Sequence, residues 1–316
     1  MRGKFVISLD FEKYWGMRDH KTIESYEENL KLVDDICVRT LHLFKKFEIH
    51  ATWAAVGFLI FKDKEELLQY IPAELPKYKN TVLNPYSYIN DFKLDPQFHF
   101  AKSVIKEIVE TSNQELATHT FSHYYCSELG NNKAAFDEDL KTAVSVFKSK
   151  LNVDVKSIIL PRNQVNKQYL QIIKKNSIRV YRGNEKNWIF NLKMPNLMTR
   201  MFRLIDSYVN ITGSNTYKLD KCKEEYLYNI PSSRFLRPVS AKNSMLKKLR
   251  LNRIKSQMTY AAKHNEIFHL WWHPHNFGND IEANMIFLDA ILEHYSFLNK
   301  TYHMESVNMK EALLKI

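Results

Sequence analysis

Residues 114–125 read QELATHTFSHYY, and this short stretch holds both a predicted strand and a predicted site. QELATH (114–119) predicts a strand, and His119 and His123 follow at a spacing of four residues. A strand that ends in ionisable side chains is typical of parallel sheets whose active site lies at one edge. The rest of the chain repeats this pattern, which decides the predicted fold.

Short β-branched runs alternate along the chain with amphipathic helical stretches. The predicted strands are residues 4–10, the start of 50–60, 114–119, 155–160, 177–181 and 267–272. The predicted helices are residues 26–47, 98–110, 133–150, 167–176 and one that begins near 281 with Asp280 as its N-cap. This alternation predicts a parallel sheet covered by helices, with room for about seven units. We expect an α/β fold, a distorted (β/α) barrel of about seven parallel strands, with an open doubly wound sheet as the alternative.

The chain reads as a single barrel domain over residues 1–316 with two irregular insertions. Four prolines between 72 and 99 predict the first insertion, and residues 184–235 form the second. A Gly-rich phosphate loop is absent, and the whole chain contains only seven glycines. These observations weigh against a dinucleotide-binding or P-loop protein.

The net charge of +11 is concentrated in one part of the sequence. Residues 237–263 contain eight Lys or Arg and no Asp or Glu, which indicates a local basic patch and not a broad nucleic-acid surface. Three distant cysteines predict no disulfide framework. The start of the chain lacks the pattern of a signal peptide, and no apolar run is long enough for a membrane span. We therefore expect a cytoplasmic protein.

Four predicted strands end in ionisable residues. Asp10 and Glu12 follow the first strand, and the last predicted strand is followed by His273 and His275. Arg162 follows the strand at 155–160, and the histidine pair follows the strand at 114–119. The carboxyl ends of parallel barrel strands open on one face, so these side chains are expected to meet in one pocket.

Two imidazoles and a carboxylate suit a transition metal such as Zn²⁺ with an open position for water. Simpler interpretations stay open from the residues alone. The histidine pair fits a solvated helix face, and the carboxylates fit a helix cap. Arg162 fits a surface ion pair, and His273 fits a structural histidine beside Pro274.

Taken together, these motifs resemble the polysaccharide deacetylase family, also called the NodB-homology or carbohydrate esterase family 4 domain. The resemblance rests on SLDFEKYWGMRD (8–19), THTFSH (118–123), PRNQ (161–164) and LWWHP (270–274). The sequences RGNE (182–185), SRFLRP (233–238) and FHLWWHPHNFG (268–278) further resemble a subgroup associated with bacterial surface-polysaccharide synthesis. The first motif departs from the usual adjacent aspartates, and PRNQ lacks the usual Pro and Gly after its arginine.

The resemblance implies metal-assisted removal of an acetyl group on a distorted β/α barrel. It implies Asp10 as the catalytic base, held by Arg162, and His273 as the acid. It implies a divalent metal, Zn²⁺ in the first place, on three ligands: Glu12, His119 and His123. The side chains expected to bind substrate are Trp15, Tyr125, Trp272 and His275.

The expected reaction is hydrolysis of an N-acetyl or related acyl group on a sugar of a surface polysaccharide or its precursor. The sugar is expected to be carried by a lipid diphosphate or a nucleotide, and no nucleic-acid partner is expected. Residues 242–258 predict a basic helix, which is either a solvated cationic helix or one that contacts phosphate or the anionic inner face of the membrane. Two alternatives stay open: a non-catalytic sugar-binding or scaffold protein, and a barrel hydrolase acting on a linear or cyclic amide.

Overall fold

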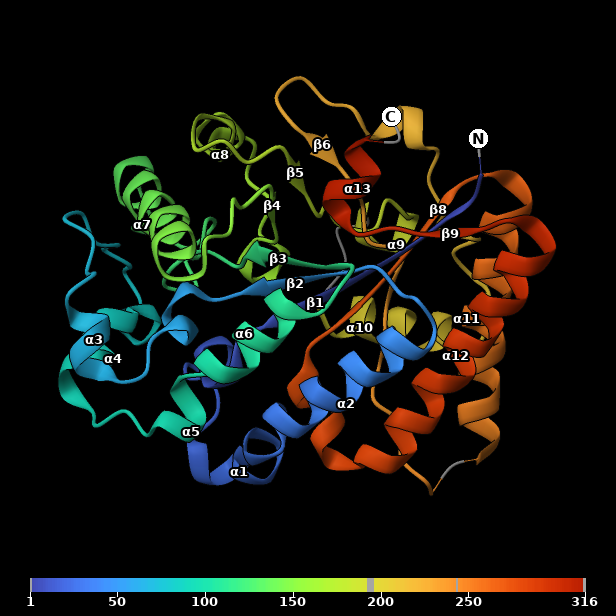
Figure 1. The fold of residues 1–316 in the computed structure, drawn as a ribbon, viewed down its shortest axis with the longest axis horizontal. Coiled ribbons are helices and arrows are strands. Elements are labelled where there is room, and N and C mark those ends of the chain that lie inside the picture. The colour runs from blue at the N-terminus through green and yellow to red at the C-terminus, as the bar shows by residue number, and fades with distance from the viewer. Residues whose placement is uncertain (1, 192–195, 243, 315–316) are drawn as a thin grey trace.

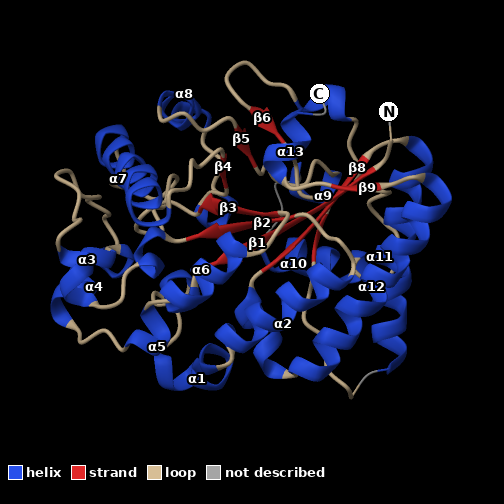
Figure 2. Cartoon of the chain, viewed as in Figure 1, coloured by secondary structure: helices blue, strands red, loops and turns tan. Residues whose placement is uncertain are grey.

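The computed structural model describes residues 2–191, 196–242 and 244–314. Its centre is strand β1 (Lys4–Phe11), all of whose residues are buried. β1 pairs in parallel with β2 (Ala51–Ala55) on one side and with β8 (Ile267–Trp272) on the other. Helices cover the sheet on both sides, so the apolar run of β1 is buried on both faces (Figures 1 and 2).

The described strands form one sheet in the order β6-β5-β4-β3-β2-β1-β8-β7, with every pairing parallel. The remaining bounds are β3 (Gln114–Thr118), β4 (Ser157–Ile158), β5 (Val180–Tyr181), β6 (Tyr228–Asn229), β7 (Arg234–Phe235) and β9 (Glu305–Ser306). β9 pairs with the start of β1. No pairing joins β6 to β7 among the described residues, so the sheet is a distorted half-barrel. The predicted barrel-like α/β fold is confirmed.

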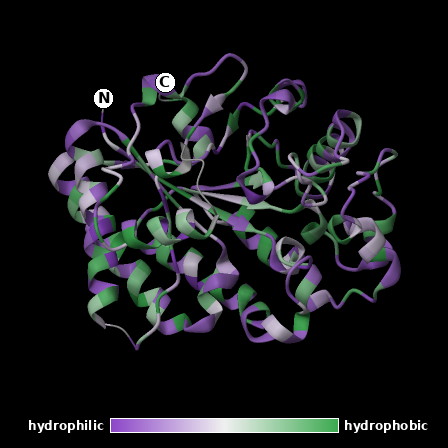
Figure 3. Ribbon diagram, turned by 180° about the vertical axis from the view of Figure 1, so that it is seen from behind, coloured by the Kyte–Doolittle hydropathy of each residue, from purple (hydrophilic) through white to green (hydrophobic). Residues whose placement is uncertain are grey.

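Most predicted helices are present with small changes in their bounds. The predicted helix 26–47 is two helices, α1 (Ile23–Lys31) and α2 (Val33–Lys46), and helix 98–110 is α5 (Pro96–His99) and α6 (Lys102–Glu110). The later helices are α7 (Lys133–Leu151), α8 (Leu170–Lys175), α11 (Ser244–His264), α12 (Ile281–Tyr302) and α13 (Met309–Leu314). Asp280 caps α12 by accepting from the Ala283 N–H, as predicted. Figure 3 shows hydrophobic and hydrophilic residues on the same helices, as expected for helices that cover a core.

Both predicted insertions contain regular structure. In the first, α4 (Pro85–Asp91) and α5 each begin at a proline, with Asn84 and Asp95 as N-caps, because proline suits the first turn of a helix. α3 (Lys64–Leu68) precedes this region. The second insertion contains α9 (Trp188–Asn191) and α10 (Asn196–Asp206), and it also supplies strands β6 and β7. β6, β7 and β9 have two residues each, too short to show a period, and were not predicted from the sequence.

Single 3₁₀ turns connect several elements: η1 (Lys13–Gly16), η2 (Gly57–Ile60), η3 (Thr81–Leu83), η4 (Pro161–Asn163), η5 (Lys167–Tyr169), η6 (Leu219–Cys222) and η7 (Pro274–Asn279). Two of them, η1 and η7, carry the chain away from the ends of β1 and β8. None of the described helices is apolar over a length that would cross a lipid bilayer.

Candidate active site

The ionisable residues that follow β1, β3 and β8 converge at one end of the sheet. Asp10 lies within β1, Glu12 lies just beyond it, and His273 directly follows β8. Since β1 is hydrogen-bonded to β8 and separated from β3 only by β2, the carboxyl ends of these strands are close in space. The predicted meeting of residues far apart in the sequence is therefore present.

Glu12, His119 and His123 form a buried cluster. The Oε2 atom of Glu12 is 3.0 Å from His123 Nε2 and 3.3 Å from His119 Nε2. One potential ligand atom from each residue lies within 4.8 Å of the other two. Both ring nitrogens of His119 and Nδ1 of His123 are buried without a hydrogen-bond partner. Buried polar atoms are normally satisfied, and two imidazoles with one carboxylate form a common zinc ligand set. The residues therefore fit a divalent cation.

A tight loop after β3 orients the two histidines. Thr120 and His123 both have positive φ, near 64° and 60°, so the chain is not helical here. Asp139 of α7 accepts hydrogen bonds from the backbone N–H groups of Phe121 and Ser122, at 2.8 and 3.1 Å, and from the Ser122 hydroxyl. Thr120 Oγ1 accepts from the Tyr124 N–H at 2.7 Å. The alternative of a histidine pair on a solvated helix face is wrong.

Gly16 makes room for the third ligand. A Cβ atom at position 16 would lie 2.0 Å from the carboxylate carbon of Glu12. The side chain of Glu12 folds back over η1 toward the histidines, and only a glycine leaves that space open. The Trp-Gly pair in the first motif thus has a physical reason: any larger residue at position 16 would displace Glu12.

Arg182 holds Asp10, and the expected partner Arg162 does not. Arg182 donates from Nη1 to Asp10 Oδ1 at 2.7 Å and from Nη2 to Asp10 Oδ2 at 2.8 Å. Arg162 instead pairs with Asp19, and its guanidinium lies over the ring of Tyr125 at 4.5 Å. The prediction for the partner of Asp10 was wrong because Arg162 lies in η4 with a positive φ of 55°, which turns its side chain away.

Arg182 could have been found from the sequence by its place in the pattern. It is the first residue after β5 and opens the RGNE motif, so it occupies the same strand-end position as the other site residues. Its guanidinium also donates to Ser8 Oγ at 3.0 Å and to Asn163 Oδ1 at 2.7 Å, and it stacks 4.1 Å from the ring of Trp271. His269 Nε2 lies 2.8 Å from Ser8 Oγ. The arginine is therefore held in one orientation.

The electrostatics of the site keep both carboxylates ionised. Burial raises the pKa of Asp10, but the charge of Arg182, followed by those of His273 and His119, outweighs burial and lowers the pKa. Burial also opposes ionisation of Glu12, yet the charge of His273 and the close contacts with His119 and His123 hold its pKa well below the usual value. Burial lowers the pKa of His123 to about 4, so this ring is neutral and able to bind a metal at neutral pH.

His273 is the most exposed member of the cluster. Its Nε2 atom lies 3.7 Å from Asp10 Oδ2 and 3.6 Å from Glu12 Oε1, and its side chain is 23% exposed, against 3% for that of Asp10. The ring of His275 stacks on it with centroids 5.1 Å apart. Burial lowers the pKa of His275 to about 3, which leaves a neutral ring behind His273. An incoming molecule would therefore meet His273 before the buried carboxylates.

Two of the predicted substrate-binding aromatics lie in the core. Trp15 is fully buried and donates its indole N–H to the His99 carbonyl at 2.8 Å. Trp272 is fully buried and stacks on Phe277. Both predictions were wrong because each ring completes hydrophobic packing beneath the site. Trp271, its neighbour in β8, points the other way and covers Arg182.

Tyr125 and His275 lie behind the site residues. The ring of Tyr125 is buried and meets that of His123 edge-on at 5.1 Å. His275 stacks on His273 and contacts Tyr26 edge-on at 5.8 Å. The structure therefore places both rings against a site residue, and their contact with substrate stays a prediction.

Comparison with known proteins agrees with this geometry. Residues 28–181, just under half of the chain, match a family model described as Polysaccharide deacetylase. This region contains the histidine pair and Arg162 but neither Asp10 and Glu12 nor His273. No curated protein matches the sequence.

Three solved structures share the fold. A protein from Mycobacterium smegmatis described as a polysaccharide deacetylase has a TM-score of 0.58 at 9% identity, covering 100% of this chain and 91% of its own. The α-amylase AmyC from Thermotoga maritima has a TM-score of 0.56 at 11% identity, covering 100% and 75%. The allantoinase Puue has a TM-score of 0.54 at 9% identity, covering 98% and 88%. Identities this low show the fold alone.

The family model and the geometry are independent of one another. The model matches by sequence across β2 to β5, and the cluster of Glu12, His119 and His123 is complete in three dimensions with Glu12 outside the matched region. By sequence, residues 28–181 match the polysaccharide deacetylase family, and the whole chain shares its fold with a protein described as a polysaccharide deacetylase.

Proposed function

We propose that this protein is a metal-dependent hydrolase that removes an N-acetyl or related acyl group from a sugar of a surface polysaccharide or of its precursor. One observation carries the proposal: the buried Glu12–His119–His123 cluster lies beside an ionised Asp10 and a partly exposed His273. A cation site, a base and an acid within a few ångströms of each other are what hydrolysis of an amide requires.

Each residue has a defined task in this proposal. A divalent cation, Zn²⁺ on this ligand set, would supply a Lewis acid that polarises an acyl oxygen and acidifies water. Asp10, kept ionised by Arg182, accepts the proton of the attacking water. His273 donates a proton to the leaving amine, which would otherwise depart as an unstable anion. Arg182 takes the positioning role that the sequence analysis assigned to Arg162.

Two other functions remain as alternatives on the same fold. A non-catalytic sugar-binding protein would not need a base, an acid and a metal cluster in one place, so the intact constellation favours an enzyme. A hydrolase of linear or cyclic amides would need the same groups, and the structural likeness to an allantoinase concerns the fold only. The choice of a sugar rests on the family.

The test combines metal content with acyl release. The purified protein is analysed for bound metals and then assayed for acetate or formate released from a panel of N-acylated and O-acylated sugars. We expect about one zinc per chain and acyl release from at least one sugar. Asp10→Asn should reduce the rate by about 10²–10⁴-fold, and Asp35→Asn, an exposed aspartate of α2, should not. Metal-loaded protein that hydrolyses none of the sugars would favour a non-catalytic role.

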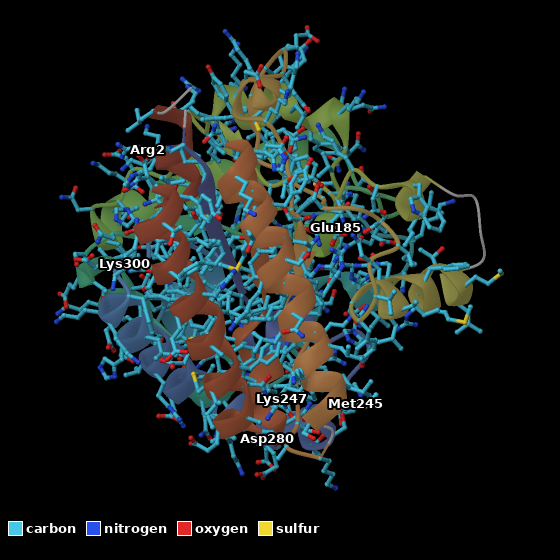
Figure 4. All side chains as sticks on the ribbon, turned by 90° about the vertical axis from the view of Figure 1, so that its right-hand side faces the viewer. Arg2, Glu185, Met245, Lys247, Asp280 and Lys300 are labelled. Atoms are coloured by element: carbon cyan, nitrogen blue, oxygen red, sulfur yellow. The ribbon has the colours of Figure 1, made fainter. Side chains whose placement is uncertain are left out.

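We also propose that the sugar is carried by a lipid diphosphate or a nucleotide, and that the protein works in the cytoplasm or at the inner face of the membrane. Several apolar side chains of α10 and of the start of α11 are exposed, with Leu197 at 78% and Met245 at 73%. Lys242 and Lys248 are exposed nearby in sequence. Figure 4 shows Met245 and Lys247 near the start of α11 (Figure 4). Apolar side chains with a cationic border suit an anionic lipid surface.

The basic residues of α11 do not all face outward. Arg253 is buried and pairs with Asp206, whereas Leu246 and Leu249, nearer the start of the helix, are 39% and 37% exposed. The membrane proposal therefore rests on the first turns of α11 and not on its whole length. Sedimentation with vesicles should show binding to anionic lipid that falls with salt. Binding that is equal for neutral and anionic vesicles would contradict it.

A further inference from the structure

We propose that a small cavity lined by Arg203, Arg234 and Arg237 binds the phosphoryl group of an activated, acylated sugar. The cavity is a narrow hollow, partly open to solvent, and it lies between α10, β7 and the segment that follows β5. Glu185, which belongs to the wall of the cavity, lies beside α11 in Figure 4. This inference rests on the proposed function, because it assumes that the neighbouring site acts on a sugar.

Positive charge exceeds negative charge around this cavity. Asp206 is shared by two arginines: Arg234 Nη2 lies 2.5 Å from its Oδ2 atom, and Arg253 Nη2 lies 3.3 Å from its Oδ1 atom. The other carboxylate of the lining is Glu185, and burial raises its pKa. Among the described lining residues, Asp206 is taken up by Arg234 and Arg253, and the weakly acidic Glu185 is the one further carboxylate beside Arg237. An anion from outside the chain would complete the charge balance.

Arg237 is the lining arginine that such an anion would pair with. Arg234 is satisfied, since it also donates to Gln257 Oε1 at 2.6 Å and to the Asp206 carbonyl at 3.3 Å. Arg237 is half-buried, and among the described residues its guanidinium makes no hydrogen bond and no ion pair. Burial lowers its pKa, and the like charges of Arg203, Arg250 and Arg234 lower it further. Arginine matches phosphate oxygens with paired hydrogen bonds, so a phosphoryl group fits this position.

The cavity borders the proposed catalytic residues through one aromatic ring. Phe235 lines the cavity, and its ring lies 4.7 Å from that of Trp271 and 5.9 Å from that of His273. In an acylamino sugar activated at the adjacent anomeric carbon, the acyl group and the phosphate are neighbours on the ring. Binding the phosphate in this cavity would place the sugar next to Phe235, against whose ring His273 also packs. A neutral polysaccharide would have no group for this cavity.

The first experiment measures binding of inorganic pyrophosphate to the metal-loaded full-length protein by titration calorimetry at low salt. Arg237→Gln should weaken binding by about 10- to 100-fold, the range expected for hydrogen bonds to a charged group. Arg200→Gln is the matched control, because Arg200 is an exposed arginine of the same helix that carries Arg203 and does not line the cavity. If pyrophosphate bound only to the metal, Arg237→Gln and Arg200→Gln would bind it with the same affinity. Equal affinities in the two variants, or no binding to the unmodified protein, would overturn the inference.

The second experiment separates this inference from the proposed function. Acyl release is compared for an acylated sugar with and without a phosphoryl group at the anomeric carbon. We expect a lower KM for the phosphorylated sugar, and this preference should fall by about 10-fold or more in Arg237→Gln. A nucleoside-diphosphate sugar and a short-chain lipid-diphosphate sugar form two further arms that identify the carrier. Equal KM values for all forms, with acyl release intact, would overturn the phosphate cavity alone. The protein could instead bind pyrophosphate through Arg237 but release no acyl group from any sugar. That result would support the phosphate-binding cavity and contradict the proposed deacetylase activity.

Discussion

The two halves of the candidate site are assembled in different ways. Glu12 and the two histidines follow strands β1 and β3, which are separated in the sheet only by β2. Arg182 follows β5, four strands from β1 in the sheet order, and yet it forms a paired ion bridge with Asp10. A flat sheet would place these residues roughly 19 Å apart, at about 4.8 Å per strand. The metal half depends on neighbouring strands, whereas the Asp10–Arg182 half depends on the curvature of the half-barrel.

Loss of a metal ligand should have the largest effect on activity. His119→Ala removes one of three ligands, so bound metal should fall to a small fraction of one equivalent. Activity should fall by about 10³-fold or more, since the metal supplies several kcal/mol of stabilisation to the transition state. Elemental analysis and acyl release check both results. His42→Ala, an exposed histidine of α2, is the control and should keep metal and activity. An unchanged metal content in His119→Ala would show that the cluster does not bind the ion.

The next largest effect tests the second half of the site. Arg182→Gln leaves Asp10 buried without its charge partner and should reduce activity by about 10²-fold while bound metal stays near its original level. Arg182 lowers the pKa of Asp10, so its loss raises that pKa, and activity should disappear at a higher pH on the acidic side of the profile. Arg162→Gln should leave the acidic side of the pH–activity profile unchanged. If Arg162→Gln shifted the acidic side of the profile and Arg182→Gln did not, Arg162 would be the partner of Asp10, as the sequence predicted.

The difference between these two halves of the site also explains which site residues could be predicted from the sequence. Asp10, Glu12, His119, His123 and His273 were found because each follows a strand with a clear pattern, and a parallel sheet brings such strand ends together. Arg162 also follows a strand, but it lies in η4, where Arg162 and Asn163 both have positive φ, and it pairs with Asp19. Local backbone turns of this kind depend on tertiary packing and leave no periodic signal.

Packing also explains the errors at the aromatic residues. Trp271 and Trp272 are consecutive in β8, so one faces the site and the other faces the core, but the sequence alone does not say which. Register with β1 decides it, because Ser8 pairs with Trp271 and Leu9 with Trp272. The two-residue strands β6 and β7 were missed because they are too short to show a period.

A smaller effect on the metal half is expected from Gly16→Ala. The new methyl group would occupy the space of the Glu12 carboxylate, so the side chain would move away from the histidines. Metal affinity should fall by about 10- to 100-fold, the range seen when the support of a ligand is lost. Competition with a chelator of known affinity measures it, and the thermal midpoint of the metal-free protein should change little. Unchanged affinity would mean that Glu12 is not a ligand and that the site relies on the histidines.

The smallest effect concerns stability in acid and compares the site with the insertion at 72–99. His99 is fully buried, its Nδ1–H donates to the Asp95 carbonyl at 2.9 Å, and its Nε2 accepts from the Tyr88 hydroxyl at 2.9 Å. Burial lowers its pKa from 6.5 to about 4. Between these two values the unfolded chain binds more protons, so stability is present above pH 6.5 and is lost as the pH falls toward 4.

His99→Gln keeps a neutral polar side chain and removes this titration. The free energy of unfolding of the variant should therefore depend less steeply on pH, by up to about 1.4 kcal/mol per pH unit within that window. Denaturant unfolding at a series of pH values measures the slope, and His20→Gln, at an exposed position, is the control. Because His123 and His275 are also buried and neutral, some acid sensitivity should remain in the variant. A slope identical to that of the unmodified protein would mean that the insertion opens before the rest of the fold, so that His99 does not contribute to the cooperative transition.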